Sequence, residues 1–479
     1  MQIIKSSREA FATPVQVVGG IVGKQRQTLP ILSNILIKKV GTKIEFTATD
    51  LDIEIKTFAD IGGDSKDISV TVDAAKLHNL INALDNTNEV TLSLKNDSDS
   101  TIELKQGKST FRLNTLPADE FPNRQATNFS QRFSMPANQF RHLLQLVHFS
   151  MAQQDIRYFL NGMLLSVDAD TIRVVTTDGH RLAYSEAKLE TPCMSMIHCI
   201  VPRRTVLELI RLIPDNENAI DVEVSNSEIR VMFGNIALSS KLVEGKFPDY
   251  NRVIPMNNNN VFKVKRELLS AALKRTAILA NAKLRGVKWD LKGNTLMIQS
   301  TNSDQEEAQD VLDIEYNGID IEIGFNLLYL QDVLNNLKSE EVQFALLSNT
   351  GAMLVTMPDV VGLNGIVVLL ADLVDAVLCS FELCLKFAEV FVSLEFGITF
   401  CDGKETADGC THFALSLLEL LDVLLAEVVN ADSHLCCFCA CRNDCVEGRF
   451  FVVGISLNGV DELWDEVGSA LVSCFDVCP

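Results

Sequence analysis

The stretch GMLLSVDADTIRVVTTDGHRLAYSE, residues 162–186, predicts three short strands joined by two tight turns. Apolar residues alternate with polar ones, and the Asp-Gly pair of the second turn is typical of a tight turn in which glycine supplies the positive φ. That turn also carries Asp178 and His180, two residue types that catalysis often uses. The rest of the chain decides whether it is a turn or part of an active site.

The same strand and turn pattern occurs twice more, in NILIKKVGTKIEFTATDLDIEIKTF (34–58) and GVKWDLKGNTLMIQSTNSDQEEAQDVL (286–312). The equivalent residue pairs in the three copies are Thr49-Asp50, Thr177-Asp178 and Thr301-Asn302. A catalytic pair does not need two structural copies, so we interpret Asp178 mainly as a turn residue. His180 and Arg181 have no counterparts in the other copies, and a local role stays open for them.

Each copy lies inside a longer repeat of about 130 residues, and repeats of this kind indicate duplicated structural units. A strand followed by a helix opens each repeat: QIIKSSREAFATPVQVV (2–18), RFSMPANQFRHLLQLV (132–147) and VFKVKRELLSAALKRT (261–276). A second helix follows the copied strands: AAKLHNLINAL (74–84), RTVLELIRLI (204–213) and LLYLQDVLNNL (327–337). We therefore expect an α+β fold of three similar domains, at residues 1–129, 130–257 and 258–373.

The third repeat is one strand short. The first two repeats each have three strand-like segments after the second helix, whereas the third has only EVQFALLS and AMLVTMP (341–348 and 352–358). The only nearby candidate for the missing strand is GIVVLLADL, residues 365–373.

The composition changes near Asp359. Up to that residue there are 38 Lys and Arg and 44 Asp and Glu, whereas the rest of the chain has 4 and 19 and holds 11 of the 13 cysteines. We expect residues 374–479 to be an atypical acidic, Cys-rich tail. Two explanations stay open, a one-base frameshift after Val368 and a genuine added domain.

The segment CCFCACRNDC, residues 436–445, could bind zinc or a soft metal ion through thiolates. It lacks the paired C-x₂-C spacing of zinc ribbons, so no metal site is expected. The chain has no apolar segment long enough to span a bilayer, and its N-terminus carries charges where a secretory signal would be apolar. We expect a soluble, cytoplasmic protein.

Several long motifs closely resemble the bacterial sliding clamp family, the β subunit of DNA polymerase III. They are collinear with the family and run from Met1 to about Asp359, and to about Val368 if the last strand is included. These motifs are TLPILSN (28–34), FPNR (121–124), FSMAQQDIRYFLNGMLL (149–165), TTDGHRLA (176–183), SKLVEGKFPDYNRVIP (240–255), RGV (285–287) and EIGFN (322–326).

The resemblance implies three domains per chain, each with two helices backed by curved antiparallel sheets, and two chains closed head to tail into a ring around duplex DNA. It implies a non-enzymatic, bacterial processivity factor that tethers the replicative polymerase. The expected partners are double-stranded DNA without sequence preference, a second copy of the chain, the DNA polymerase III catalytic subunit, the clamp loader and other proteins with a clamp-binding peptide. No catalytic residue, cofactor or membrane contact is expected.

A ring that retains DNA topologically needs only weak, sequence-independent contacts to phosphates. By the resemblance, the residues near DNA are Arg26, Gln154, Tyr158 and Phe159. The expected helices and adjacent turns also carry basic residues, which could equally be ordinary solvated positions: Arg141, Arg203, Arg204, Arg211, Lys265, Arg266, Lys274 and Arg275.

The resemblance also implies a pocket for a short partner peptide between the second and third domains, apolar with a few polar groups at its edge. The matching residues are Leu160, Thr177, Gly179, His180, Leu182, Pro248, Arg252 and Val253, with Arg157, Asn326 and Tyr329 nearby. At the dimer contact, Phe111 and Leu113 match positions that face Ile278 and Leu279 of the other chain.

Two alternative functions stay open. One is an enzyme of another class built on Asp178, His180 and the cysteine cluster, although no nucleophile or metal constellation is evident. The other is a clamp-derived chain whose aberrant tail impairs ring closure or partner binding. After Val368 the chain departs from the family's usual ending, which supplies a proline and an arginine to the peptide pocket.

Overall fold

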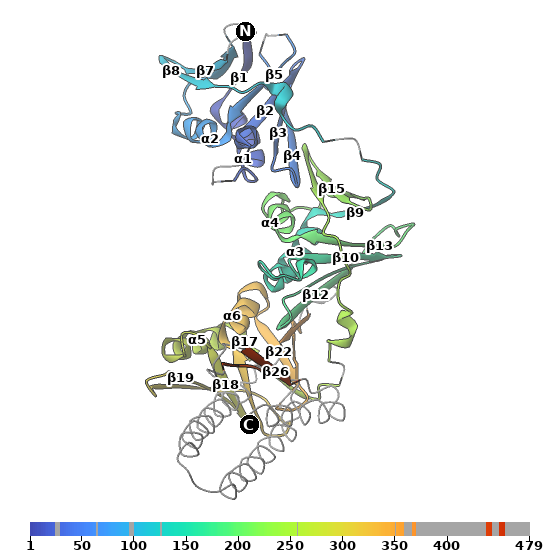
Figure 1. Cartoon of the computed structure of the whole chain (residues 1–479), viewed down its shortest axis with the longest axis vertical. Coiled ribbons are helices and arrows are strands. Elements are labelled where there is room, and N and C mark those ends of the chain that lie inside the picture. The colour runs from blue at the N-terminus through green and yellow to red at the C-terminus, as the bar shows by residue number, and fades with distance from the viewer. Residues whose placement is uncertain are drawn as a thin grey trace, which may run out of the picture. The chain divides into compact units, whose positions relative to one another are not determined.

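The computed structural model describes residues 1–23, 29–63, 66–94, 100–124, 127–255, 257–349, 351–358, 366–369, 437–442 and 450–455. The chain divides into two compact units, Met1–Asp372 and Leu373–Pro479. In the second unit the described residues form a two-stranded antiparallel sheet of β25 (Cys437–Arg442) and β26 (Phe450–Ile455). The first unit contains the three repeats (Figure 1).

The three repeats have the same order of elements. The first consists of β1 (Gln2–Ser6), α1 (Arg8–Gly19), β2 (Asn34–Val40), β3 (Lys43–Thr49), β4 (Ile53–Ala59), β5 (Ile68–Asp73), α2 (Ala74–Ala83), β6 (Val90–Leu94), β7 (Thr101–Gln106) and β8 (Ser109–Asn114). The second consists of β9 (Gln131–Pro136), α3 (Ala137–Val147), β10 (Gly162–Asp168), β11 (Thr171–Thr177), β12 (Arg181–Lys188), β13 (Ile197–Pro202), α4 (Arg203–Leu212), β14 (Ala219–Val224), β15 (Glu228–Phe233) and β16 (Ile236–Lys241). The third consists of β17 (Asn260–Lys265), α5 (Arg266–Thr276), β18 (Gly286–Lys292), β19 (Thr295–Thr301), β20 (Glu307–Asp313), β21 (Ile321–Asn326), α6 (Leu327–Asn336), β22 (Glu341–Leu346), β23 (Met353–Thr356) and β24 (Ile366–Leu369).

Helix starts follow local capping chemistry. The Ser7 side chain accepts a hydrogen bond from the Ala10 N–H at the start of α1, and Asp73 accepts from the Lys76 N–H at the start of α2. Such caps satisfy backbone donors that the first helical turn leaves unpaired. In the second repeat Pro136 precedes α3, where its fixed φ suits the entry to a helix. The helices expected from the sequence are confirmed.

The sheets are shared between neighbouring repeats. One eight-stranded sheet has the order β5-β2-β3-β4-β16-β15-β14-β9, so that β4 of the first repeat pairs with β16 of the second. The other has the order β13-β10-β11-β12-β24-β23-β22-β17, so that β12 pairs with β24. We call these pairings junction one and junction two. The missing strand predicted after residue 365 is therefore confirmed as β24, which lies between β23 and β12.

The two junctions have the same register. Ile55 lies opposite Leu238 at junction one, and Ala183 lies opposite Val367 at junction two. Ile55 and Ala183 are equivalent, because each lies opposite the residue that precedes the threonine at the end of the neighbouring strand, and Ala308 holds the same position in the third repeat. A single rule of pairing thus joins each repeat to the next.

Two four-stranded sheets remain at the ends of the repeat unit. The first has the order β1-β6-β7-β8 and the second β20-β19-β18-β21. Within the described part of the chain, β8 and β20 are therefore edge strands. They are the equivalents of β16 and β12, the strands that pair at the junctions.

The main hydrophobic core lies between the helices and the sheets. Phe11 and Val15 of α1, Leu144 of α3 and Leu273 of α5 are all fully buried in it. Because alternate residues of a strand point to opposite faces, the other face of each sheet carries a separate set of side chains. At junction two that second face holds an apolar cluster, whereas a polar cavity lies on the side of the helices.

Candidate functional site

The turn that joins β11 to β12 is held by its own side chains. The Asp178 Oδ1 atom accepts hydrogen bonds from the N–H groups of His180 and Arg181, at 3.0 Å each. The Thr177 hydroxyl donates to the Arg181 carbonyl at 2.7 Å. Gly179 has a φ of +93°, a conformation that residues with a Cβ rarely adopt. The turn interpretation of Asp178 is confirmed.

The equivalent turn of the first repeat makes the same bonds. The Asp50 Oδ1 atom accepts from the N–H groups of Asp52 and Ile53, and the Thr49 hydroxyl donates to the Ile53 carbonyl. In the third repeat Asn302 Oδ1 accepts from the N–H groups of Asp304 and Glu306. The shared residue types therefore serve a shared backbone geometry.

Arg181 makes both a local contact and contacts with residues far away in the sequence. Its side chain is only 9% exposed and donates to Asp178 Oδ2 at 3.0 Å, to the Phe149 carbonyl at 2.9 Å and to Asp332 Oδ2 on α6 at 2.7 Å. The guanidinium carbon also lies 4.4 Å from the centre of the Tyr329 ring, a distance typical of a cation–π contact. One side chain thus fastens the turn of the second repeat to the helix of the third.

A polar cavity of about 700 Å³ adjoins Arg181. Its walls come from the segment after α3, the β11–β12 turn, the start of α4, and α6. The lining residues are His148, Phe149, Met151, Ala152, Gln153, Gln154, Asp155, Arg157, Asp178, His180, Arg181, Arg203, Tyr329, Asp332 and Asn336. The Arg157 guanidinium bonds to Asp155 and holds the pKa of that carboxyl down at about 2.

An apolar cluster lies on the face of the junction-two sheet opposite the helices. Its buried members are Leu164, Val175, Leu182, Ile200, Phe247 and Val368. The linker that follows β16 packs against it through Tyr250 and Ile254, and Phe159 of the 3₁₀ helix η4 (Tyr158–Leu160) packs against it from another side. The six buried members are at most 4% exposed, so a short peptide anchor would meet the partly buried residues around them first.

The predicted pocket residues fall into three groups. Arg157, His180 and Tyr329 line the polar cavity, and the His180 and Tyr329 ring centres are 6.1 Å apart. Leu160 and Leu182 are each 2% exposed and belong to the interior, Leu182 as part of the apolar cluster. The others are at the surface or partly covered: Thr177 and Gly179 in the turn, Pro248, Arg252 and Val253 on the linker, and Asn326 at the start of α6.

Junction one has the same geometry but different chemistry. From the strand registers, Leu164, Val175, Leu182, Ile200, Leu354 and Val368 correspond to Leu36, Thr47, Glu54, Thr71, Arg230 and Ser239. Five of these six counterparts are polar. The surface that is apolar at junction two is therefore polar at junction one.

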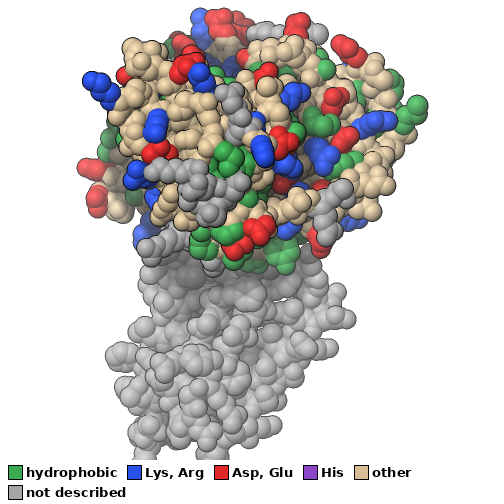
Figure 2. Space-filling model, turned by 90° about the horizontal axis from the view of Figure 1, so that it is seen from above, with side chains coloured by type: hydrophobic (Ala, Val, Ile, Leu, Met, Phe, Trp, Pro, Cys, Tyr) green, Lys and Arg blue, Asp and Glu red, His purple; other side chains and the backbone are tan. Residues whose placement is uncertain are grey.

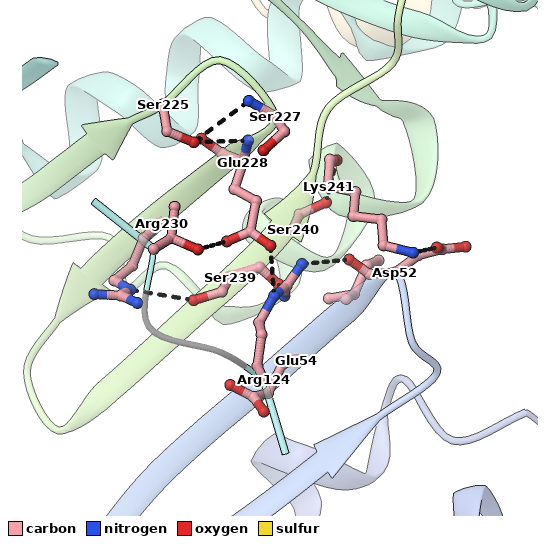
Figure 3. Close-up of polar contacts among 12 residues, drawn as sticks. Asp52, Glu54, Arg124, Ser225, Ser227, Glu228, Arg230, Ser239, Ser240 and Lys241 are labelled. Carbon is pink, nitrogen blue, oxygen red and sulfur yellow. Dashed lines mark hydrogen bonds and ion pairs between the residues drawn. The ribbon is translucent and has the colours of Figure 1, made fainter. Parts of the chain in front are cut away.

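A network centred on Arg124 covers that polar surface (Figure 3). The Arg124 guanidinium donates to Glu228 Oε1 at 3.0 Å, to the Ser239 carbonyl at 2.9 Å and to the Asp52 carbonyl at 3.3 Å. Lys241 adds an ion pair with Asp52 at 3.0 Å. The segment between β8 and β9, which carries Arg124, is thus bonded across junction one. In the equivalent segment between β16 and β17, the Arg252 side chain is 86% exposed.

Of the residues expected near DNA, Gln154 and Tyr158 are exposed and Phe159 is half-buried. Gln154 also has a φ of +58°. Arg26 lies outside the described residues. On the face shown in Figure 2, basic and acidic side chains are interspersed.

Most of the basic side chains expected on DNA-lining helices contact the chain itself. Arg204 pairs with Asp50 at 2.5 Å, Arg211 donates to the Val17 carbonyl at 2.9 Å, and Arg275 pairs with Asp310 at 2.6 Å. Backbone carbonyls accept from Arg141, Arg203 and Arg266 as well. The sequence could not separate these structural roles from phosphate contacts.

The residues expected at the dimer contact lie on or beside the two edge strands β8 and β20. Phe111 and Leu113 are on β8, where Leu113 is 8% exposed and packs in its own core. Ile278 and Leu279 are in the 3₁₀ helix η6 (Ala277–Leu279) beside β20, and Ile278 is 79% exposed. Leu113 is thus partly a core residue, whereas Ile278 is an unusually exposed apolar residue.

Among the described residues, no group of three or more His, Cys, Asp or Glu side chains is placed to hold a metal ion. The cysteine side chains of 436–445 and the stretch 370–373 lie outside the described residues. No helix within the described ranges is long and apolar enough to cross a membrane.

Comparison with known protein families matches the three repeats to three consecutive domains of one family, in the same order along the chain. Family models of the DNA polymerase III beta subunit match its N-terminal domain at residues 1–125, its central domain at 134–249 and its C-terminal domain at 251–366. The beta sliding clamp of Pseudomonas aeruginosa is 40% identical over 352 residues, which are 74% of this chain and 95% of that protein. The beta sliding clamp of Escherichia coli K12 is 37% identical over 348 residues, covering 72% and 93%.

Solved structures of DNA polymerase III beta subunits superpose on this chain. The crystal structure of the DNA polymerase III subunit beta from Pseudomonas aeruginosa superposes with a TM-score of 0.73 and 38% identity, covering 78% of this chain and all of that chain. A Caulobacter crescentus pol III beta structure gives 0.71 and 31%, with the same coverage.

Proposed function

This chain belongs to the DNA polymerase III beta subunit family and is a sliding clamp, and we propose that it works as a head-to-tail dimer that encircles duplex DNA and holds partner peptides at junction two. The alternative of an unrelated enzyme is not favoured, because Asp178, one of the residues on which it rested, shapes its turn as Asp50 and Asn302 do in the other repeats. The proposed role is non-enzymatic and cytoplasmic.

The pairing rule of the junctions carries the proposal. Within the chain, β4 pairs with β16 and β12 pairs with β24, in the same register. The next pairing in the series would join β20 to β8, the edge strands at the two ends of the unit. A second copy supplies the missing partner at both ends, so that in a closed assembly neither β8 nor β20 is left as an edge strand.

Applying the same register to the third pairing places Ala308 opposite Phe111 and Glu307 opposite Arg112 of the other chain. Phe111 is the equivalent of Leu238 and Val367, which are buried at the existing junctions. Glu307 and Arg112 have opposite charges, and both are exposed in the single chain. Charge and apolarity therefore both suit this contact.

Junction two is the proposed site for partner peptides such as that of the replicative polymerase. His180, Arg157 and Tyr329 line the polar cavity, while Leu182 and Val368 belong to the buried apolar cluster on the opposite face of the same sheet, and the β11–β12 turn lies next to both. Gln154, Tyr158 and Phe159, on the segment that also borders the cavity, are proposed to contact DNA. We propose that the clamp loader uses the same surface.

Retention on circular DNA tests the proposed function. The full chain, labelled with a fluorophore, would be loaded onto a nicked circular plasmid by the clamp loader of its own organism. We expect the chain to stay on the circle for minutes and to leave within seconds after a restriction enzyme linearises the plasmid, because only topology retains it. Equal loss from circular and linear DNA would contradict encirclement.

A further inference from the structure

The two sides of the proposed peptide pocket come from different repeats. The β11–β12 turn of the second repeat presents Gly179 and His180, and α6 of the third repeat presents Tyr329. A pocket of this kind keeps its shape only if the two repeats hold a fixed position at that point. The contacts of Arg181 show how this position is maintained.

We propose that Arg181 and Asp332 are positioning residues for the peptide pocket. Asp178 shapes the turn with one carboxylate oxygen and binds Arg181 with the other. Arg181 then binds Asp332, which lies three residues after Tyr329 on α6, and its guanidinium lies over the Tyr329 ring. One guanidinium therefore sets the spacing between His180 and Tyr329. The inference rests on the proposed function of junction two.

The charges at this point favour a rigid arrangement. Arg181 is nearly buried and binds two carboxylates and a carbonyl, so its planar fork has a fixed orientation. Burial and the nearby Arg181 charge lower the pKa of Arg203, which lines the same cavity. Removing the negative charge of Asp332 would leave the positive charges of Arg181 and Arg203 less well neutralised. Helix α6 would also lose its charged contact with the turn.

Junction one offers a matched comparison. There too an ion pair joins the turn of one repeat to the second helix of the next, but the acid, Asp50, is on the turn and the base, Arg204, is on the helix. Lys241 and Asp52 form a further pair across junction one. These pairs fasten repeats together without lining the proposed pocket.

Peptide affinity in charge-deleted variants tests the proposal. The probe is a fluorescein-labelled synthetic peptide that copies the clamp-binding segment of the DNA polymerase III catalytic subunit, titrated with full-length protein and followed by fluorescence anisotropy. We expect Asp332→Asn to weaken peptide binding roughly threefold to tenfold, because the variant loses the charge-assisted hydrogen bond between Arg181 and a partly exposed carboxylate. Asp332→Glu keeps the negative charge and should bind the peptide almost as tightly as wild type. Arg181→Lys should bind as weakly as Asp332→Asn, since lysine lacks the planar fork.

Lys241→Gln is the control, because it deletes an ion pair between repeats at junction one. Its unfolding temperature would be measured beside that of Asp332→Asn. An unchanged affinity in Asp332→Asn, or an equal loss in Lys241→Gln, would overturn the inference. If the wild-type chain itself does not bind the peptide, the proposed function of junction two fails instead.

Discussion

Phe149 and Ile278 occupy equivalent positions just beyond the first helix of the second and third repeats, yet Phe149 is 8% exposed and Ile278 is 79% exposed. Phe149 lies beside Arg181 at junction two, where a neighbouring repeat is present. Ile278 lies near β20, which among the described residues pairs on one side only, with β19. The difference supports our proposal that a second chain binds at this end of the third repeat.

Replacing Ile278 with aspartate should therefore disrupt the dimer. The substitution puts a charge into a contact that burial of an apolar side chain stabilises, and we expect the dimer dissociation constant to rise at least about tenfold. Native mass spectrometry across a dilution series measures it. Ile319→Asp is the control, because Ile319 is also exposed in the third repeat. A dimer that survives in Ile278→Asp would contradict this placement of the interface.

The register proposed for the third pairing predicts an ion pair between chains, from Arg112 to Glu307. Reversing either charge alone, as Arg112→Glu or Glu307→Arg, should weaken the dimer about fivefold, since exposed pairs contribute little and the ring contains two of them. Combining both reversals should restore dimerisation. Sedimentation analysis at low and high salt would measure dimerisation. Because Arg112 also pairs with Glu103 of its own chain at 3.5 Å, the decisive variant is Glu307→Arg, and an unchanged dimer in that variant would contradict this register.

Gly179 is predicted to be needed for the pocket and not only for folding. Its φ of +93° strains any residue with a Cβ, and a Cβ there would lie 3.3 Å from the Arg157 guanidinium. We expect Gly179→Ala to lower the free energy of unfolding by about 1–2 kcal/mol and to weaken peptide binding. Gly234→Ala is the matched control, because Gly234 also has a positive φ but has open space around it.

In that comparison, denaturant unfolding measures stability and fluorescence anisotropy measures peptide affinity. Both alanine variants should lose stability, whereas only Gly179→Ala should lose affinity. A loss of affinity in Gly234→Ala of the same size would mean that the effect comes from general destabilisation.

The sequence revealed the repeats, the helices and the need for a last strand, because these depend on local patterns of apolar and turn residues. The identity of β24 could be predicted because each repeat must end with the same three strands. The apolar character of Leu182 against the polar Glu54 was also visible once the two turns were aligned. These features follow from local sequence patterns and from the comparison of one repeat with another.

Contacts between repeats could not be predicted in this way. Arg181 and Asp332 are separated by 151 residues, and neither belongs to a motif that would join them. Arg204 and Arg211 carry the charge expected of a DNA-lining helix, but their side chains bind Asp50 and the Val17 carbonyl. A basic residue on a helix has the same sequence signal in both roles, so only the packing of one repeat on the next distinguishes them.

Arg124 is predicted to be the main polar fastening of junction one. Its side chain and that of Glu228 are 16% and 15% exposed, so Arg124→Ala leaves a largely buried carboxylate without its charged partner. We expect the free energy of unfolding to fall by about 2–3 kcal/mol at neutral pH. Arg132→Ala, at an exposed arginine of the second repeat, should change it little.

The loss in Arg124→Ala should depend on pH. Burial alone would raise the pKa of Glu228, but the Thr127 hydroxyl and the Arg124 guanidinium outweigh it, and the pKa lies below its usual value. The stability that this carboxylate contributes is therefore present above the ordinary carboxyl pKa and is lost as the pH falls through the lowered one. Wild type and Arg124→Ala should converge in acid, as measured by urea unfolding from pH 7 downward. A difference that stays constant with pH would mean that Arg124 acts through packing and not through Glu228.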